Sequence, residues 1–267
     1  MANDNSRDWL QRAAHPGKVE RIEAYFSGYA YSLHRHDTYA IGRTLAGVQN
    51  FHYRGSTRHS LPGQTMVLHP DEVHDGEAGT EAGFRYRMIY LEPALVQQAL
   101  GGRALPFICG GQSDDPRLFA ATEALLQRMD DPLDAFAEED AIYDLVQVMA
   151  GVAGQRRGRQ TFDFVAAERA RLFIHDTLAL PICLDDLVQA SGRERFALSR
   201  DFRVLYGTSP YRYITQRRLE RARRLMLSGV SLTEAALGAG FYDQSHMTRH
   251  FQQALGLTPA RWLHMQG

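Results

Sequence analysis

Lysine, cysteine and long apolar runs are almost absent from this 267-residue sequence. Lys18 is the only lysine, so 29 of the 30 basic residues are arginine. Cys109 and Cys183 are far apart and lack metal-type spacing, which excludes a disulfide framework and favours reduced thiols in a reducing compartment. No stretch is apolar enough to span a bilayer, and the first 12 residues lack the apolar segment of a signal peptide. We therefore expect a cytoplasmic protein without a membrane partner.

Signatures of the common enzyme classes are also missing. The sequence contains no glycine-rich nucleotide-binding loop, no Gly-x-Ser-x-Gly nucleophile elbow and no His-Glu-x-x-His zinc motif. Outside one group of three histidines, nothing in the sequence supports catalysis. We expect a protein that is not an enzyme and that carries no cofactor.

Charge is divided unevenly between the two halves of the chain. Residues 1–154 carry 13 basic and 21 acidic residues, a net charge of −8, whereas residues 155–267 carry 17 basic and 10 acidic residues, a net charge of +7. An acidic half joined to a basic half is typical of a sensor domain attached to a nucleic-acid-binding domain. Because nearly all the basic residues are arginine, which genome composition also favours, the asymmetry is support for this division rather than proof.

The period of the apolar pattern changes near the middle of the chain. Between residues 21 and 93, closely spaced glycine turns separate short runs in which apolar and polar residues alternate, which indicates the strands of a sandwich or barrel. From Pro116 onward the apolar residues recur with helical spacing, and a helix is predicted over residues 135–152. The apolar face of that helix either joins two copies of the chain or packs on its own domain.

These patterns predict an α+β protein with two domains. Residues 1–153 form a small N-terminal β-barrel with following helices. Residues 154–163 are the linker, because the segment 154–160 has no apolar residue to bury. Residues 164–267 form an all-α domain.

One arrangement of residues occurs twice in this second domain. It consists of an Arg-x-Phe group followed at fixed distances by glycine, by serine or threonine, and by proline. The first copy contains Arg200, Phe202, Gly207, Ser209 and Pro210, and the second contains Arg249, Phe251, Gly256, Thr258 and Pro259. Upstream of each copy, a small residue and a glycine four positions later suit the tight turn of a helix-turn-helix. The repeat therefore predicts two helix-turn-helix units in one chain.

Residues 164–262 resemble the double helix-turn-helix domain of the AraC/XylS family of bacterial transcription regulators, and the segment 240–251 is very close to the family signature. The matching positions are Leu187, Gly192, Leu198, Arg200, Phe202, Gly207 and Pro210 in the first unit, and Gly240, Phe241, Gln244, Ser245, Arg249, Phe251, Gly256 and Pro259 in the second. The first unit departs from the family at Val188, where alanine is usual, and at Glu194, where a small capping residue is common.

The resemblance assigns roles to the residues of the two recognition helices. Leu198, Phe202, Met247 and Phe251 are expected in the core. The residues expected to contact DNA are Arg195, Phe196, Ser199, Arg200, Arg203, Gln244, Ser245, His246 and Arg249. Arginine and glutamine can recognise guanine and adenine edges, although each of these side chains can instead contact phosphate or form a salt bridge within the protein. The two helices should protect major-groove segments about 10 base pairs apart.

The N-terminal region resembles the cupin-like effector domains that often precede this module. The resemblance depends on the motifs around His34, His36, Tyr39 and His74, and these four residues are the expected effector-binding groups. Three imidazoles can also hold zinc or iron, but residues 40–42 lack the glutamate of cupin enzymes. We therefore assign no metal site from the sequence.

The sequence thus predicts a DNA-binding transcription regulator that responds to a small-molecule effector in its N-terminal barrel. Its expected partners are double-stranded DNA, the effector, RNA polymerase and a second copy of the chain. Two alternatives stay open. One is a metal-dependent cupin enzyme fused to a DNA-binding domain. The other is an effector-independent DNA binder, which would show steep salt dependence and little preference for target DNA.

Overall fold

The computed structural model describes residues 8–13, 17–127, 129–130, 134–153 and 162–265. Within these residues the first half of the chain forms ten strands. They are β1 (Trp9–Arg12), β2 (Glu20–Phe26), β3 (Tyr29–His34), β4 (Tyr39–Gly47), β5 (Gln49–Tyr53), β6 (Ser56–Ser60), β7 (Thr65–Leu68), β8 (His74–Ala78), β9 (Phe84–Leu91) and β10 (Gln112–Ser113). All the strand pairs are antiparallel, as expected for short strands joined by tight turns.

The strands lie in two sheets. One has the order β1-β2-β9-β4-β7-β10 and the other the order β3-β8-β5-β6. Alternation along β9 decides which residues enter which core: Phe84, Tyr86 and Met88 pack between the sheets, whereas Ile89 and Leu91 face the helices. The predicted alternation of residues 84–88 is therefore confirmed.

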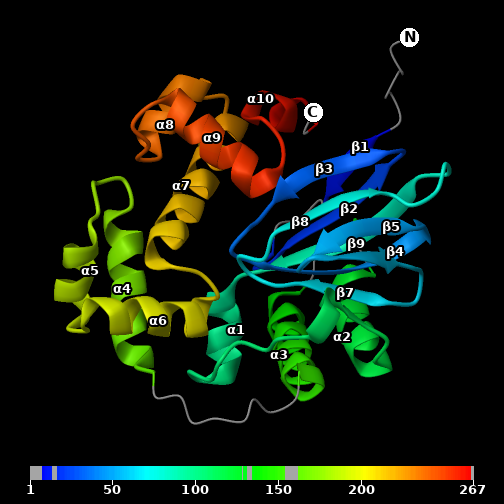
Figure 1. Ribbon diagram of the computed structural model, residues 1–267, viewed down its shortest axis with the longest axis horizontal. Helices are drawn as coiled ribbons and strands as arrows, with labels where there is room; N and C mark the ends of the chain where they lie inside the picture. Colours follow the sequence, from blue (N-terminus) through cyan, green and yellow to red (C-terminus); the bar gives the residue numbers. More distant parts are fainter. Residues whose placement is uncertain (1–7, 14–16, 128, 131–133, 154–161, 266–267) are drawn as a thin grey trace.

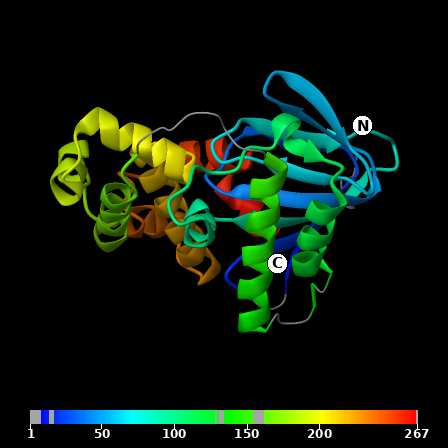
Figure 2. The ribbon, with the colours of Figure 1, turned by 90° about the horizontal axis from the view of Figure 1, so that it is seen from below.

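Four helical elements follow the strands or interrupt them: α1 (Pro93–Leu100), the 3₁₀ turn η1 (Cys109–Gly111), α2 (Pro116–Leu126) and α3 (Ala135–Ala153). Figure 2 shows α2 and α3 in green across one face of the blue and cyan strands. The apolar face of α3, which includes Ile142, Leu145 and Met149, is buried in this core. Of the two roles predicted for this helix, the structure shows packing on its own domain.

The second half of the chain is entirely helical within the described residues. It contains α4 (Phe164–Thr177), α5 (Leu184–Ser191), α6 (Arg195–Tyr206), α7 (Pro210–Leu227), α8 (Leu232–Gly238), α9 (Gln244–Leu255) and α10 (Pro259–His264). Two separate cores hold these helices, one around Phe202 and one around Phe251. The long helix α7 contributes Tyr213 to the first core and Leu219 to the second, so it joins the two helix-turn-helix units (Figure 1). The predicted α+β organisation is confirmed.

Several further expectations concern the chain as a whole. The predicted linker falls mainly on residues 154–161, which lie outside the described residues, so the domain boundary stays a prediction. Cys109 and Cys183 are free and exposed. None of the helices in the described ranges combines the length and the apolar content needed to cross a membrane.

Candidate functional site

Each recognition helix begins at an acidic cap and ends at a glycine. The Glu194 carboxylate accepts hydrogen bonds from the backbone N–H groups of Phe196 and Ala197, at 3.0 and 3.2 Å, so it replaces the small cap that is usual at the start of α6. At the matching position before α9, Asp243 accepts from His246 N at 2.6 Å. A carboxylate at either position also suits the positive end of the helix dipole.

The core residues predicted for the two units are confirmed, because Leu198, Phe202, Met247 and Phe251 are fully buried. The structure places the predicted DNA-contacting residues on the outer faces of α6 and α9. Arg195, Phe196, Arg200, Arg203, Ser245 and Arg249 are exposed, whereas Ser199, Gln244 and His246 are half-buried. Phe196, with 79% of its surface exposed, is the most prominent apolar side chain of this set.

Some of these side chains already have partners in the protein. Arg195 forms a salt bridge with Asp185 at 2.5 Å. The Gln244 side-chain oxygen accepts from the Thr233 hydroxyl at 2.7 Å. His246 turns back toward the protein, with its Nε2 at 3.0 Å from Nε2 of His250.

The two arginines of the repeat differ in their surroundings. Arg200 approaches the buried carboxylate of Asp201 at 3.3 Å, but Arg193 makes the shorter contact with that carboxylate, at 2.8 Å. Arg249 is exposed and forms no ion pair among the described residues. Arg249 is therefore the better candidate for reading a base.

Arg249→Ala should weaken binding by about 1–3 kcal/mol at one half of the target and relax sequence preference there, because a bidentate arginine contact to guanine contributes about this much discrimination. The measurement is selection of bound sequences from a random duplex pool, followed by affinity titration. Arg224→Ala removes the same charge from an exposed position of α7 and serves as the control. Equal effects of the two substitutions across all sequences would mean that Arg249 contacts only phosphate.

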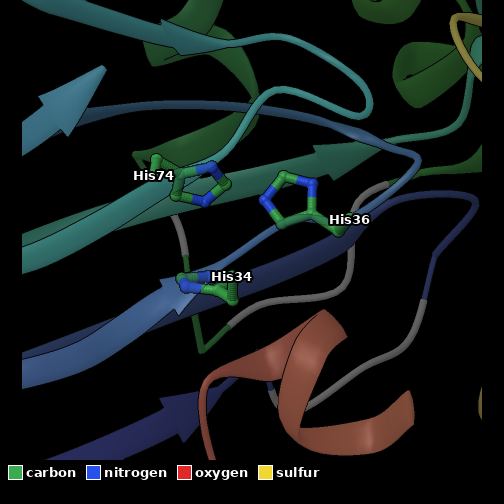
Figure 3. A group of neighbouring side chains, drawn as sticks. All are labelled: His34, His36 and His74. Atoms are coloured by element: carbon green, nitrogen blue, oxygen red, sulfur yellow. The ribbon is translucent and has the colours of Figure 1, made fainter. Parts of the chain in front are cut away.

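Three histidines converge at one edge of the N-terminal domain (Figure 3). His34 ends β3, His36 follows in the next loop, and His74 begins β8, which pairs with β3 in the same sheet. The rings of His34 and His74 have centroids 4.3 Å apart, and those of His36 and His74 are 4.8 Å apart. Burial lowers the pKa of each ring, that of His36 to about 3, so all three are neutral at physiological pH.

Tyr39 does not join this group, contrary to the prediction. It begins β4 on the side that faces the helices, where it is fully buried and its hydroxyl donates to Pro106 O at 2.7 Å. The strand alternation explains the difference, because Ala40 and not Tyr39 points between the sheets. His69 is also apart from the group: it is buried and accepts at Nε2 from the backbone N–H of Ile108 at 2.9 Å.

The three histidines line a cavity between the two domains. From the N-terminal domain, Leu10, Ile22, Tyr31, Met88 and Tyr90 line it as well. From the C-terminal domain, Gln216, Leu219, Glu220, Arg223, Leu257 and Trp262 line it. A ligand in this cavity would touch both domains at once.

The charged residues of this cavity were not predicted from the sequence. Arg12 and Arg223 both pair with Glu20, at 3.0 and 3.1 Å, and both guanidinium groups lie over the Trp262 ring, at 5.3 and 5.1 Å from its centre. These four residues come from β1, β2, α7 and α10, and no short motif links them. Arg223 stands among the other arginines of α7, so nothing in the local sequence separates it from arginines on the solvent side of the helix.

A buried ion-pair network fastens α7 to the N-terminal domain. Arg217, with 3% of its surface exposed, contacts Asp37 at 2.8 Å, Glu92 at 2.9 Å and Glu220 at 2.9 Å. Burial raises the pKa of Asp37 and raises the pKa of Glu220 to about 7, while the nearby guanidinium opposes both shifts. The stability of the contact between α7 and the N-terminal domain therefore depends on the Arg217 guanidinium, which is shared among three carboxylates.

The C-terminal ends of both recognition helices are attached to the N-terminal domain. At the end of α6, the Gln97 side chain donates to Leu205 O at 2.9 Å. At the end of α9, the backbone N–H of Arg35 donates to Gln253 O at 3.1 Å. The orientation of the two helices relative to each other is thus coupled to the docking of the domains.

Two protein families match separate parts of the chain. Residues 16–146 match the family described as AraC-like ligand binding domain, and residues 187–265 match the family described as helix-turn-helix domain. The chain is 26% identical over 241 residues to YbfI of Bacillus subtilis, an uncharacterized HTH-type transcriptional regulator, covering 85% of this chain and 86% of that protein. It is 31% identical over 90 residues to the HTH-type transcriptional activator AarP of Providencia stuartii, covering 33% of this chain and 67% of AarP.

A solved structure has the same overall fold. ToxT from Vibrio cholerae aligns with a TM-score of 0.64 over 97% of this chain and 99% of the ToxT chain, at 13% sequence identity. The two matched families, the repeated helix-turn-helix and the shared fold lead to one conclusion. The chain belongs to the AraC/XylS family of transcription regulators, with an AraC-like ligand-binding domain before its DNA-binding helices.

Proposed function

We propose that a small molecule bound in the interdomain cavity controls how tightly this regulator binds DNA. The observation that carries the proposal is that the cavity is lined by both domains. A ligand that contacts both domains binds more tightly when they are docked than when they are apart, so it shifts the population toward the docked state. Its lining of leucine, methionine and aromatic side chains suits a small, largely apolar ligand. ToxT, which shares the fold, has been solved with an unsaturated fatty acid bound.

We further propose that the docked state has the lower affinity for DNA. Docking pairs three arginines of α7 with carboxylates of the N-terminal domain. The pairs are Arg212–Asp71, Arg217–Asp37, Arg217–Glu92 and Arg223–Glu20. Arginines neutralised in this way add less to the positive field that attracts DNA phosphates. Docking also restrains the ends of both recognition helices, so they adjust less freely to two successive major grooves.

In the DNA-bound state, α6 and α9 each enter a major groove of one duplex. The proposed contacts are those expected from the sequence. Of these residues, Ser245 and Arg249 are exposed in the second unit, and Arg195, Phe196, Arg200 and Arg203 are exposed in the first. RNA polymerase and a second copy of the chain are further proposed partners, and the cytoplasm is the proposed location.

The test reverses the charge at the interdomain contact. Asp37→Arg places two arginines in contact and should open the interface, which raises affinity for the selected target DNA about tenfold. Adding Arg217→Asp restores an opposite-charge pair and should return the affinity toward the wild-type value. Affinity is measured with the full chain at physiological salt, because phosphate contacts depend on salt.

The control is Asp114→Arg, which makes the same charge change at an N-terminal position far from α7 in sequence and not part of the network. If the control raises affinity as much as Asp37→Arg, the effect is one of net charge. If Asp37→Arg separates the domains but leaves DNA affinity unchanged, the docked state is not the low-affinity state.

A further inference from the structure

We propose that His34, His36 and His74 bind one divalent transition-metal ion of the zinc type, with an open coordination position facing the interdomain cavity. One ring nitrogen of each residue lies within 4.8 Å of the others. His34 and His36 lie two residues apart, at the end of β3 and in the loop after it, and His74 begins the paired strand β8. The three rings face a common point (Figure 3). This inference goes beyond the proposed control of DNA binding and does not depend on it.

The hydrogen bonds of the three rings decide which nitrogen is available. Each Nδ1 lies near a backbone carbonyl two residues away: His34 near Ser32 O at 2.8 Å, His36 near Thr38 O at 2.9 Å, and His74 near Glu72 O at 2.9 Å. A carbonyl can only accept, so each Nδ1 carries the proton and donates it. Each Nε2 therefore keeps a free lone pair. Metal-binding histidines are commonly oriented in this way by a carbonyl at the second nitrogen.

Three buried lone pairs that lie this close together need a hydrogen-bond donor or a cation to interact with. Within the described residues, no side chain or backbone group donates a hydrogen bond to Nε2 of these histidines. A single cation satisfies the three lone pairs at once.

The surroundings favour a cation over an anion. The cavity is lined by two arginines, Arg12 and Arg223, which both pair with Glu20. Three further carboxylates line it, those of Asp37, Asp75 and Glu220. Arg217 pairs with Asp37 and Glu220, so these four carboxylates still outnumber the three arginines that contact them.

Neutral imidazoles select a borderline ion such as Zn²⁺, Co²⁺ or Fe²⁺. Zinc–nitrogen bonds of about 2.0–2.1 Å place tetrahedral ligand nitrogens about 3.3 Å apart, so binding would draw the three rings slightly together. Cupin enzymes add a glutamate, which residues 40–42 do not supply here. The fourth position is thus left for water or for an oxygen ligand that enters from the cavity, which is the arrangement of an open metal site.

The test uses tag-free full-length protein titrated with Co²⁺, whose visible absorption reports four-coordinate nitrogen ligation, and then with Zn²⁺ in competition. We expect saturation at one equivalent. His36→Gln and His74→Gln should each weaken binding at least about 100-fold, because each removes a direct ligand. His59→Gln is the matched control, since His59 is exposed on β6 and lies outside the group.

Far-UV circular dichroism of each variant separates loss of a ligand from loss of fold. A second readout is the melting temperature, which Zn²⁺ should raise for the wild type and for His59→Gln but not for His34→Gln. The wild-type titration decides the question even if a variant misfolds. Absence of a saturable one-equivalent Co²⁺ spectrum, or its persistence in folded His36→Gln and His74→Gln proteins, would overturn the proposal.

Discussion

Replacing Arg217 with methionine should separate the two domains at about pH 8 while each of them stays folded. The substitution preserves most of the side-chain volume but leaves Asp37, Glu92 and Glu220 together without their cation. Removing one partner of a buried ion pair costs about 3–5 kcal/mol, because the remaining charges are desolvated and unpaired. The interface can relieve this cost by opening, so that water reaches the carboxylates. Small-angle scattering of the full chain should show a larger radius of gyration.

The effect of this substitution depends on pH. A carboxyl group whose pKa is higher in the folded than in the unfolded chain binds more protons when folded, so its contribution to stability falls as the pH rises through that window. The raised pKa values of Asp37 and Glu220 rise further without Arg217. The domains of Arg217→Met should therefore separate fully at about pH 8 and stay more closely docked at about pH 5.5.

Arg221→Met is the control for this experiment. Arg221 is exposed on the same helix and has no ion pair among the described residues, so its loss should leave the scattering profile unchanged. If Arg217→Met also leaves the profile and the urea midpoint unchanged at about pH 8, the network does not hold the domains together.

Phe251→Ala should destabilise the second helix-turn-helix unit by about 3–5 kcal/mol, because it empties a fully buried aromatic position. Phe251 packs edge-on against Trp262, with ring centroids 5.7 Å apart. Urea unfolding followed by Trp262 fluorescence should therefore report the loss directly, and protection of the second DNA half-site should disappear with it.

Two comparisons test the interpretation of that result. Phe196→Ala, at an exposed position of α6, should change stability by less than about 0.5 kcal/mol. Arg249→Ala should relax the second half-site without moving the unfolding curve. A loss below about 1 kcal/mol for Phe251→Ala would show that the residue is not a main support of this core.

The helix-turn-helix units could be predicted because short-range interactions define them. Gly207 and Gly256 end the recognition helices in the left-handed conformation, with φ angles of 73° and 67°, and their common spacing appears directly in the sequence. Phe202 and Phe251 are buried by helices that lie within the same unit. Such contacts leave a local pattern that one sequence is enough to reveal.

The interdomain cavity depends on contacts that local sequence patterns do not reveal. The histidine pair His34 and His36 could be recognised, yet Tyr39 was placed on the wrong side because the register of β4 depends on its neighbours in the sheet. Arg217 is buried in contact with Asp37, which lies 180 residues away in the chain. The apolar periodicity of a helix gives no information about a partner that is so distant in the sequence.

The sequence by itself determined the two classes of domain and the repeated DNA-reading unit, because spacing and burial within a segment decide these features. The tertiary structure alone decided that three neutral histidines meet, that Arg217 sits among three carboxylates, and that one cavity is shared by both domains. These features depend on contacts between segments far apart in the chain. Their energies come from desolvation and charge pairing at the docked surface, which exist only after both domains have folded.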